Sequence, residues 1–361
     1  MSFALVICLT LGAIECFPRF FEGLSIVSAA AVMPGAYASV LIDRLTASQT
    51  VSDPDIADGD ESERKEREET EQNETSSSTP SGETVKPQKA GKISEYAFVP
   101  SKTSSKIIWQ NGAAFSNTSK VSNDEILKIL KTAPTIKLSE NKPQVLIYHT
   151  HATESYEMSD LGYYEEGSSA RTTDERNNMI RVGDEITAQL EKAGIQVIHD
   201  RSLYDHPSYN GAYNRSAETV KKYLEKYPSI EITLDIHRDA IEQNGGVRVK
   251  PTAVINGKKA AQVMIIAGVD DGTMDFPKWK ENMKFASALQ SSMESKFPGL
   301  TRAAMVCHRR YNMYLTQNSL LIEVGGHANT LDEAVFSGEM IGKSLVSVLK
   351  EYGTNEKDNK K

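Results

Sequence analysis

The chain has 361 residues, with 41 Lys and Arg against 49 Asp and Glu, and so a formal net charge of −8. The charge is unevenly placed, because residues 51–80 contain 11 acidic and three basic side chains, a balance equal to that of the whole chain. The remainder is close to neutral and shows no basic patch of the size that binds a phosphate backbone. We therefore expect an acidic linker and no nucleic-acid partner.

Cysteine usage limits the possible metal chemistry. The three cysteines are too few for a disulfide framework, and none belongs to a Cys-x-x-Cys pair. Any metal site must therefore use histidine and carboxylate ligands.

The N-terminal region contains two apolar runs. Residues 24–42 are 19 residues without a charge, close to the ~20 that cross a bilayer. Residues 3–17 lack the basic start that is typical of a secretory signal. We expect a single-pass membrane anchor at residues 24–42, with a cleaved signal segment as the alternative. Arg19 and Arg44 flank this run on opposite sides, so positive charge does not decide its orientation.

Composition divides the rest of the chain. Residues 46–95 are polar and acidic with few aromatic residues, which is typical of a disordered linker. A short helix is expected at residues 123–131, capped by Ser122. The expected organisation is an apolar region with the anchor at 1–45, an acidic disordered linker at 46–95, a pre-domain segment at 96–141, an enzyme-sized domain at 142–353 and a polar tail at 354–361.

From residue 142 onward, short apolar runs alternate with segments of helical spacing. The expected strands are 145–148, 195–199, 230–236, 261–268 and 320–324. The expected helices are 176–193, 212–227, 278–297 and 330–352. This alternation predicts an α/β domain with a twisted, mostly parallel sheet and helices on both faces. In such sheets, ligand sites form at the carboxyl ends of the strands.

Two of the expected strands end in histidines. The run at 145–148 leads into His149, His151 and Glu154, and the run at 230–236 leads into His237. Imidazole and carboxylate groups are zinc donors, and catalytic zinc usually has three protein ligands. We expect His151, Glu154 and His237 to bind zinc.

Several alternatives to this ligand set remain open. Strict alternation along the strand places His149 on the same face as His151, so His149 is an alternate ligand or a partner of one, as is Asp239. Asp174 and Glu175 are further carboxylate options. The remaining histidines are expected in loops or at the surface: His199, His206, His308 and His327.

A third strand carries a carboxylate. Glu323 lies among Leu, Ile and Val, where a buried charge is costly unless it is paired or functional. Glu323 is therefore the candidate base that activates a water molecule. Arg238 either stabilises an oxyanion or pairs with Asp235 or Asp239, since both uses need the same guanidinium donors.

Six separated motifs occur in an order that resembles the stage II sporulation protein P family, over about residues 142–350. They are Tyr148-His-Thr-His-Ala-Thr-Glu-Ser155, Arg181-Val-Gly-Asp184, Tyr209-Asn-Gly-Ala-Tyr213, Asp235-Ile-His-Arg-Asp239, Arg310-Tyr-Asn312 and Leu321-Ile-Glu-Val-Gly325. The resemblance implies a zinc amidase (phosphorylase/hydrolase-like) architecture. It also implies a membrane-anchored N-acetylmuramoyl-L-alanine amidase and endopeptidase that acts on peptidoglycan during engulfment. The implied partners are stage II sporulation proteins D and M, and the implied location of the enzyme domain is the wall-facing side of the cell membrane.

The resemblance also assigns roles to residues. The histidine motifs map to His149/His151 and to His237, and the catalytic glutamate maps to Glu323. The carboxylate ligand maps to Asp174 or Glu175 if it opens the first helix, as in the broader amidases. It maps to Glu154 if it follows the histidine as His-x-x-Glu, as in zinc carboxypeptidases. The alternative functions are a metallopeptidase that acts mainly on stem-peptide cross-links and a non-catalytic wall-binding scaffold.

Overall fold

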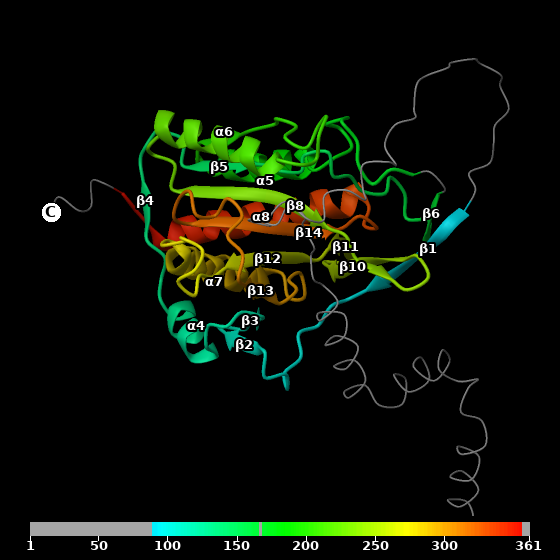
Figure 1. Ribbon diagram of the computed structural model, residues 1–361, viewed down its shortest axis with the longest axis horizontal. Coiled ribbons are helices and arrows are strands. Elements are labelled where there is room, and N and C mark those ends of the chain that lie inside the picture. Colours follow the sequence, from blue (N-terminus) through cyan, green and yellow to red (C-terminus); the bar gives the residue numbers. More distant parts are fainter. Residues whose placement is uncertain (1–88, 166–167, 356–361) are drawn as a thin grey trace, which may run out of the picture. The chain divides into compact units, whose positions relative to one another are not determined.

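The computed structural model describes residues 89–165 and 168–355 (Figure 1). All the described residues belong to one compact unit. The anchor expected at residues 24–42 and most of the expected acidic linker lie outside the described residues. No helix within the described ranges is both long and apolar enough to cross a membrane.

The main sheet has eight strands in the order β2-β3-β13-β12-β14-β8-β5-β7. Their bounds are β2 Ile107–Gln110, β3 Ala113–Asn117, β5 Val145–Tyr148, β7 Val197–His199, β8 Ile232–Asp239, β12 Val263–Gly268, β13 Ala304–Cys307 and β14 Ser319–Gly326. All neighbouring pairs are parallel except β2 with β3 and β12 with β14. The predicted α/β class with a mostly parallel sheet is confirmed.

Helices cover both faces of this sheet. They are α4 Asn123–Leu130, α5 Ile180–Lys192, α6 Ala212–Lys226, α7 Trp279–Lys296 and α8 Leu331–Tyr352. Along β5, Val145 and Ile147 join the core that contains α5, α7 and α8, whereas Leu146 and Tyr148 pack with Val220 of α6. This alternation between the two faces is what a strand buried on both sides requires.

Helix starts follow local hydrogen bonds. The helix expected from residue 176 begins at Ile180, because residues 174–177 form a turn in which the Asn177 N–H donates to the Asp174 carbonyl. The start of α8 is a capping box, in which Thr330 and Glu333 bond each other's backbone N–H groups. Ser122 caps α4 as expected, by accepting from the Glu125 N–H.

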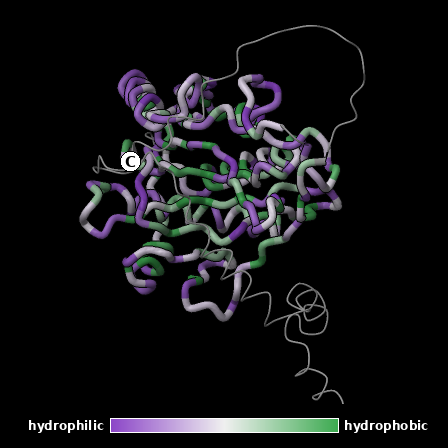
Figure 2. Tube along the Cα trace, turned by 45° about the vertical axis from the view of Figure 1, so that its right-hand side comes forward, coloured by the Kyte–Doolittle hydropathy of each residue, from purple (hydrophilic) through white to green (hydrophobic). Residues whose placement is uncertain are grey.

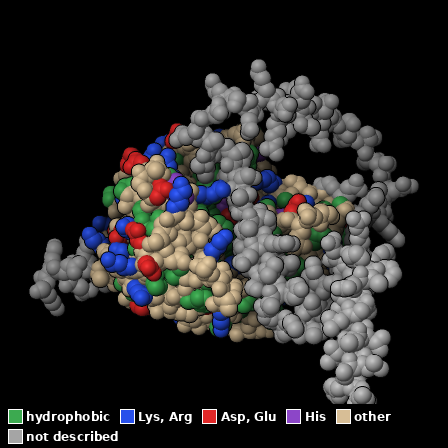
Figure 3. Space-filling model, turned by 60° about the horizontal axis from the view of Figure 1, so that its bottom comes forward, with side chains coloured by type: hydrophobic (Ala, Val, Ile, Leu, Met, Phe, Trp, Pro, Cys, Tyr) green, Lys and Arg blue, Asp and Glu red, His purple; other side chains and the backbone are tan. Residues whose placement is uncertain are grey.

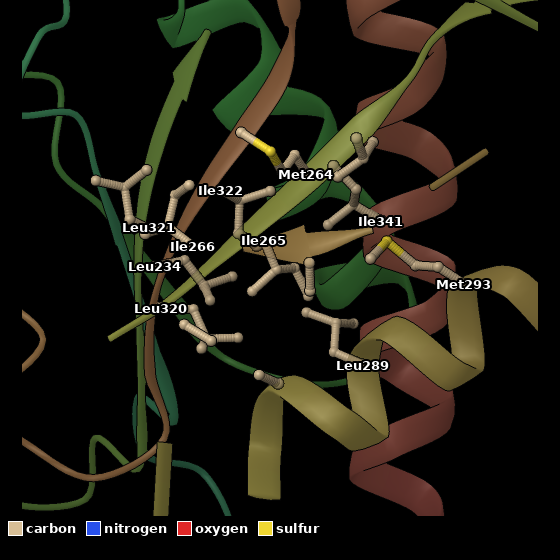
Figure 4. Close-up of a cluster of buried hydrophobic side chains, with 14 of the residues drawn as sticks. Leu234, Met264, Ile265, Ile266, Leu289, Met293, Leu320, Leu321, Ile322 and Ile341 are labelled. Atoms are coloured by element: carbon tan, nitrogen blue, oxygen red, sulfur yellow. The ribbon is translucent and has the colours of Figure 1, made fainter. Parts of the chain in front are cut away.

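The centre of the core lies where β12 and β14 meet α7 and α8. Figure 4 shows Ile265 of β12 and Ile322 of β14 facing Leu289 of α7 and Ile341 of α8, and all four side chains are fully buried. Each such burial stabilises the fold by about 1.5–3 kcal/mol relative to exposure. Figure 2 shows hydrophobic residues along the inner strands and hydrophilic residues in many outer loops.

A second, five-stranded sheet has the order β11-β10-β1-β6, with β9 also paired to β10. Its strands are β1 Lys89–Tyr96, β6 Tyr163–Glu165, β9 Glu242–Gln243, β10 Val247–Ile255 and β11 Lys258–Ala261. The start of β1 lies inside the range that was expected to be a linker. A separate parallel pair joins β4 Ile136–Leu138 to β15 Gly353–Asn355, where the polar tail was expected to begin.

The described residues before residue 142 pack against the expected enzyme-sized domain. Within the expected pre-domain segment 96–141, β3 pairs in parallel with β13, and β2 forms the edge of the main sheet. The helix α4 packs against α7 and β2. On the face shown in Figure 3, basic and acidic side chains are interspersed rather than gathered by sign.

A buried lysine connects the second sheet to α8. Lys250 of β10 has a side chain that is only 1% exposed, and its Nζ lies 2.7 Å from Glu333 Oε1 and 2.8 Å from Asp160 Oδ1. Glu333 is also the residue of the capping box at the start of α8. Removal of one partner from such a buried ion pair leaves an uncompensated charge.

We expect Lys250→Ala to lower the free energy of unfolding by about 3–5 kcal/mol, because buried Glu333 loses its cation. Lys259→Ala is the matched control. Lys259 pairs with Asp160 and Glu95 but is 44% exposed, so its removal should cost about 1 kcal/mol or less. Urea unfolding of both variants measures the difference, and equal costs would contradict a structural role for Lys250.

Candidate metal centre

Three adjacent strands bring the candidate residues together. β5 ends at Tyr148, directly before His149 and His151, and β8 carries His237. β14 lies parallel to β8 with Glu323 opposite His237. The carboxyl ends of β5, β8 and β14 therefore meet at one edge of the sheet, as parallel pairing requires.

Glu154 and His237 face each other. Glu154 Oε2 lies 3.7 Å from His237 Nδ1, and two zinc ligands bound tetrahedrally at about 2.0–2.2 Å lie on the order of 3.4 Å apart. The other ring nitrogen of His237, Nε2, lies 2.8 Å from Asp235 Oδ1. Burial lowers the pKa of His237, but Asp235, Glu154 and Glu323 together raise it to about 10. These carboxylates favour a positive charge at this position.

His151 is buried, and neither of its ring nitrogens has a hydrogen-bond partner. Its ring stacks on Tyr209, with centroids 4.4 Å apart, and meets the rings of Tyr213 and His237 edge to face. The nearest carboxylate oxygen, Asp205 Oδ2, lies 4.0 Å from Nδ1, beyond hydrogen-bond distance. A buried imidazole without hydrogen-bond partners is costly unless it binds a ligand. The donor set of His151, Glu154 and His237 thus has the chemistry of a zinc site.

The donor atoms of these three side chains are not all within 4.8 Å of one another. Among the described residues, the group that meets this distance is Asp270, Asp271 and His308, in the loops that follow β12 and β13. Asp270 accepts four backbone N–H groups of its own loop, and Asp271 lies 3.0 Å from His308 Nε2. These loop contacts satisfy the two carboxylates without a metal.

The two glutamates at the site have opposite pKa shifts. Burial would raise the pKa of the Glu154 carboxyl, but Arg238, His237 and His151 hold it below its usual range. Burial, followed by the charge of Asp239, raises the pKa of Glu323 to about 8. Glu323 Oε2 is also buried without a hydrogen-bond partner. One carboxylate is thus stabilised as an anion, and the other is able to take up a proton near neutral pH.

His149 has different neighbours from His151. Its Nδ1 is 3.0 Å from the Ile236 carbonyl and its Nε2 is 2.9 Å from His199 Nε2. Burial and His199 lower the pKa of His149 to about 3. The strict alternation expected for His149 and His151 does not hold, because the strand ends at Tyr148 and the chain turns.

The helix α5 approaches this histidine pair closely at Gly183. A Cβ at Gly183 would lie 2.4 Å from His199 Nε2 and 2.6 Å from His149 Nε2, so glycine is needed there. His199 is therefore a packed residue rather than a surface one, with Nδ1 3.2 Å from Asp184. His327 lies in the turn after β14, as expected for a loop residue, and is 4% exposed.

The alternative carboxylates have other partners. Asp174 forms a hydrogen-bonded ion pair with Arg176, and Glu175 pairs with Arg201 at 2.9 Å. Asp239 pairs with Arg302, also buried, at 2.7 Å. Of the carboxylates considered as ligands, Glu154 is the one next to His237.

The guanidinium of Arg238 is hydrogen-bonded to backbone carbonyls. Its guanidinium is 4% exposed and donates to the carbonyls of Ser155, Ala170 and Asp239. Its backbone N–H donates to Glu154 Oε2 at 3.1 Å. This geometry favours a role in holding the loop between residues 155 and 170 over stabilisation of an oxyanion.

Sequence reasoning missed several residues around the histidines. Arg171, which is 38% exposed, lies over the ring of Tyr209 and within 3.7 Å of Glu154. Buried Asp205 accepts from Arg171 and from Thr153. These residues lie in loops without periodicity, and the Tyr209-to-Tyr213 motif was the only signal for two of the aromatic rings.

The fold and the site define an α/β protein with a histidine and glutamate cluster, suited to a divalent metal, at the carboxyl ends of parallel strands. The model of the family Stage II sporulation protein P (SpoIIP) matches residues 32–346. The chain therefore belongs to the stage II sporulation protein P family.

Individual proteins give further comparisons. Stage II sporulation protein P of Bacillus subtilis (strain 168) is 31% identical over 211 residues, which cover 55% of this chain and 49% of the relative. The chain thus spans about half the length of the curated relative it matches.

Two solved structures are N-acetylmuramoyl-L-alanine amidases, AmiC2 of Nostoc punctiforme and an enzyme of Clostridium difficile 630. The first is 12% identical, with a TM-score of 0.36 over 59% of this chain and 98% of that one. The second is 17% identical, with a TM-score of 0.37 over 62% and 100%. A likeness at these TM-scores carries no conclusion about the site.

We expect Arg238→Met to lower the free energy of unfolding of chelator-treated protein by about 2–4 kcal/mol, because buried carbonyls lose their donor and Glu154 loses a cation. The loop at residues 155–170 should also become sensitive to limited proteolysis. Arg176→Met is the control, since Arg176 is 86% exposed and its removal should change stability by about 0.5 kcal/mol or less. An Arg238→Met protein as stable as the wild type would leave the guanidinium available for catalysis instead.

Proposed function

We propose that the protein is a zinc-dependent peptidoglycan hydrolase that cleaves the N-acetylmuramoyl-L-alanine amide bond and stem-peptide cross-links during engulfment in sporulation. The observation that carries the proposal is the pairing of Glu154 with His237 beside two buried groups without hydrogen-bond partners, the imidazole of His151 and Oε2 of Glu323. Membership of the stage II sporulation protein P family supports the sporulation role.

In this proposal His151, Glu154 and His237 hold the zinc ion. When bound, zinc supplies Lewis-acid polarisation of the scissile carbonyl and of a water molecule. Glu323 would take a proton from the attacking water at Oε2 and return it to the leaving nitrogen. Its pKa, raised to about 8 by burial and by Asp239, suits both steps.

The loops around the site have distinct tasks in the proposal. Arg238 keeps the loop after Ser155 closed over Glu154 through its bonds to backbone carbonyls. Arg171 is the partly exposed guanidinium beside Glu154, and it is suited to contact a carbonyl or carboxylate of the stem peptide. A non-catalytic scaffold gives no reason for a half-buried glutamate whose Oε2 is enclosed without a hydrogen-bond partner, as in Glu323.

The proposal extends to location and partners. The charge-free run at residues 24–42 would anchor the chain in the cell membrane, and the acidic segment after it would tether the enzyme domain on the wall-facing side. Stage II sporulation proteins D and M are the proposed partners. Labelling of an introduced cysteine in the enzyme domain by a membrane-impermeant reagent, in intact cells, tests the wall-facing orientation.

Glu323→Gln should lower turnover of purified peptidoglycan by about 10²–10⁴-fold, because the amide cannot accept the proton. Zinc content should be unchanged, since Glu323 is not one of the proposed ligands. Dye release from labelled peptidoglycan and metal analysis of the same sample measure the two effects. Loss of zinc along with turnover would make Glu323 a ligand, and mass analysis of the wild-type products identifies the bonds that are cleaved.

His151→Ala and His237→Ala should each remove the zinc, about one ion per chain, together with activity. His308→Ala is the matched control, because His308 belongs to the exposed group with Asp270 and Asp271. Metal analysis after dialysis under zinc-replete conditions measures occupancy. Zinc that disappears only in His308→Ala would place the metal at that surface group and contradict the proposed site.

A further inference from the structure

We propose that Asp235 is the positioning residue that sets which ring nitrogen of His237 faces the metal and that fixes the backbone next to His151. The inference rests on the proposed function, because it assumes that these two histidines hold zinc. Asp235 lies two residues before His237 on β8, so that both side chains project from the same face of the strand.

The carboxylate of Asp235 contacts both histidine segments. Its side chain is 3% exposed, and Oδ1 lies 2.8 Å from His237 Nε2. Oδ1 also accepts from the backbone N–H of Thr150 at 2.8 Å, and Oδ2 accepts from Thr150 Oγ1 at 2.6 Å. Thr150 directly precedes His151, so one buried group joins the segment after β5 to the middle of β8.

The contact with His237 assigns the roles of its two ring nitrogens. The contact is a 2.8 Å approach of Nε2 to Oδ1 that is not aligned as a hydrogen bond. A carboxylate has no proton to donate, so a protonated Nε2 is the form of the ring that suits this short distance. Nδ1 then remains as the metal donor, and it is Nδ1 that lies 3.7 Å from Glu154 Oε2. A carboxylate behind a histidine ligand also raises the basicity of the ring.

The same network continues away from the histidines. Thr150 Oγ1 lies 2.8 Å from Ser216 Oγ of α6, and Asn312 Nδ2 donates to Ser216 Oγ at 2.8 Å. Asn312 also donates to the Tyr213 carbonyl. Ser216 is therefore buried in the network that contains Asp235, but no hydrogen bond or ion pair of its side chain reaches a histidine in the described structure.

This difference defines a matched pair of variants in the full chain. Asp235→Asn keeps the size of the side chain but removes its charge, and an amide can turn either its oxygen or its NH₂ towards His237. We expect its zinc affinity, measured by competition with a chelator, to fall about 10–100-fold. Ser216→Ala removes a hydroxyl from the same network and should leave the zinc affinity within about twofold of the wild type. Equal affinities in the two variants would overturn the proposal.

A second measurement does not depend on how the variants fold. In the wild-type chain loaded with ¹¹³Cd and labelled with ¹⁵N-histidine, the metal coupling of the ring nitrogens identifies the donor atom. We expect His237 to bind through Nδ1, with Nε2 protonated. Coupling to Nε2 overturns the role of Asp235 while the hydrolase proposal stands, whereas a wild-type chain that binds neither zinc nor cadmium overturns both.

Discussion

The parallel alignment of β8 between β5 and β14 is the constraint on which the site depends. It sets Glu323 opposite His237 and Asp235 opposite Tyr148, in strands that are covered by helices on both faces. Charged groups in such a position are strongly desolvated and must be compensated nearby. The residue types around the strand ends follow largely from which positive group lies next to which carboxylate.

Two buried arginines provide permanent positive charges, in addition to the partly exposed Arg171 beside Glu154. Arg302 pairs with Asp239, and Arg238 lies beside Glu154 while its guanidinium donates to loop carbonyls. Both are buried, and neither is free to leave its partners without exposing a charge or a carbonyl. The remaining negative charge, from Asp235, Glu154 and Glu323, faces the imidazole of His237. A cation at this imidazole would complete the balance.

The same neighbouring charges give Glu154 and Glu323 different pKa values. Glu154 has cationic neighbours and a lowered pKa, whereas Glu323 has Asp239 among its neighbours and a raised one. Two residues of the same type therefore receive different chemical properties from their positions in the sheet. Away from the site, Lys250 neutralises Glu333 and Asp160. Its ion pairs connect the second sheet to the start of α8.

Composition and periodicity were enough to predict the α/β class, five of the strands and all five described helices, because these elements are long or apolar enough to show a regular pattern. The sequence also predicted that His151, Glu154, His237 and Glu323 lie at or near strand ends, whereas the order of β14, β8 and β5 in the sheet came from the tertiary structure. The second sheet came from long-range pairing, since β1 pairs with β10 across more than 150 residues of chain. Contacts between distant segments also turn His149 towards His199, bond Arg238 to loop carbonyls and join Asp235 of β8 to the segment after β5. These outcomes depend on hydrogen bonds and ion pairs between segments far apart in the chain, for which local composition and spacing carry no signal.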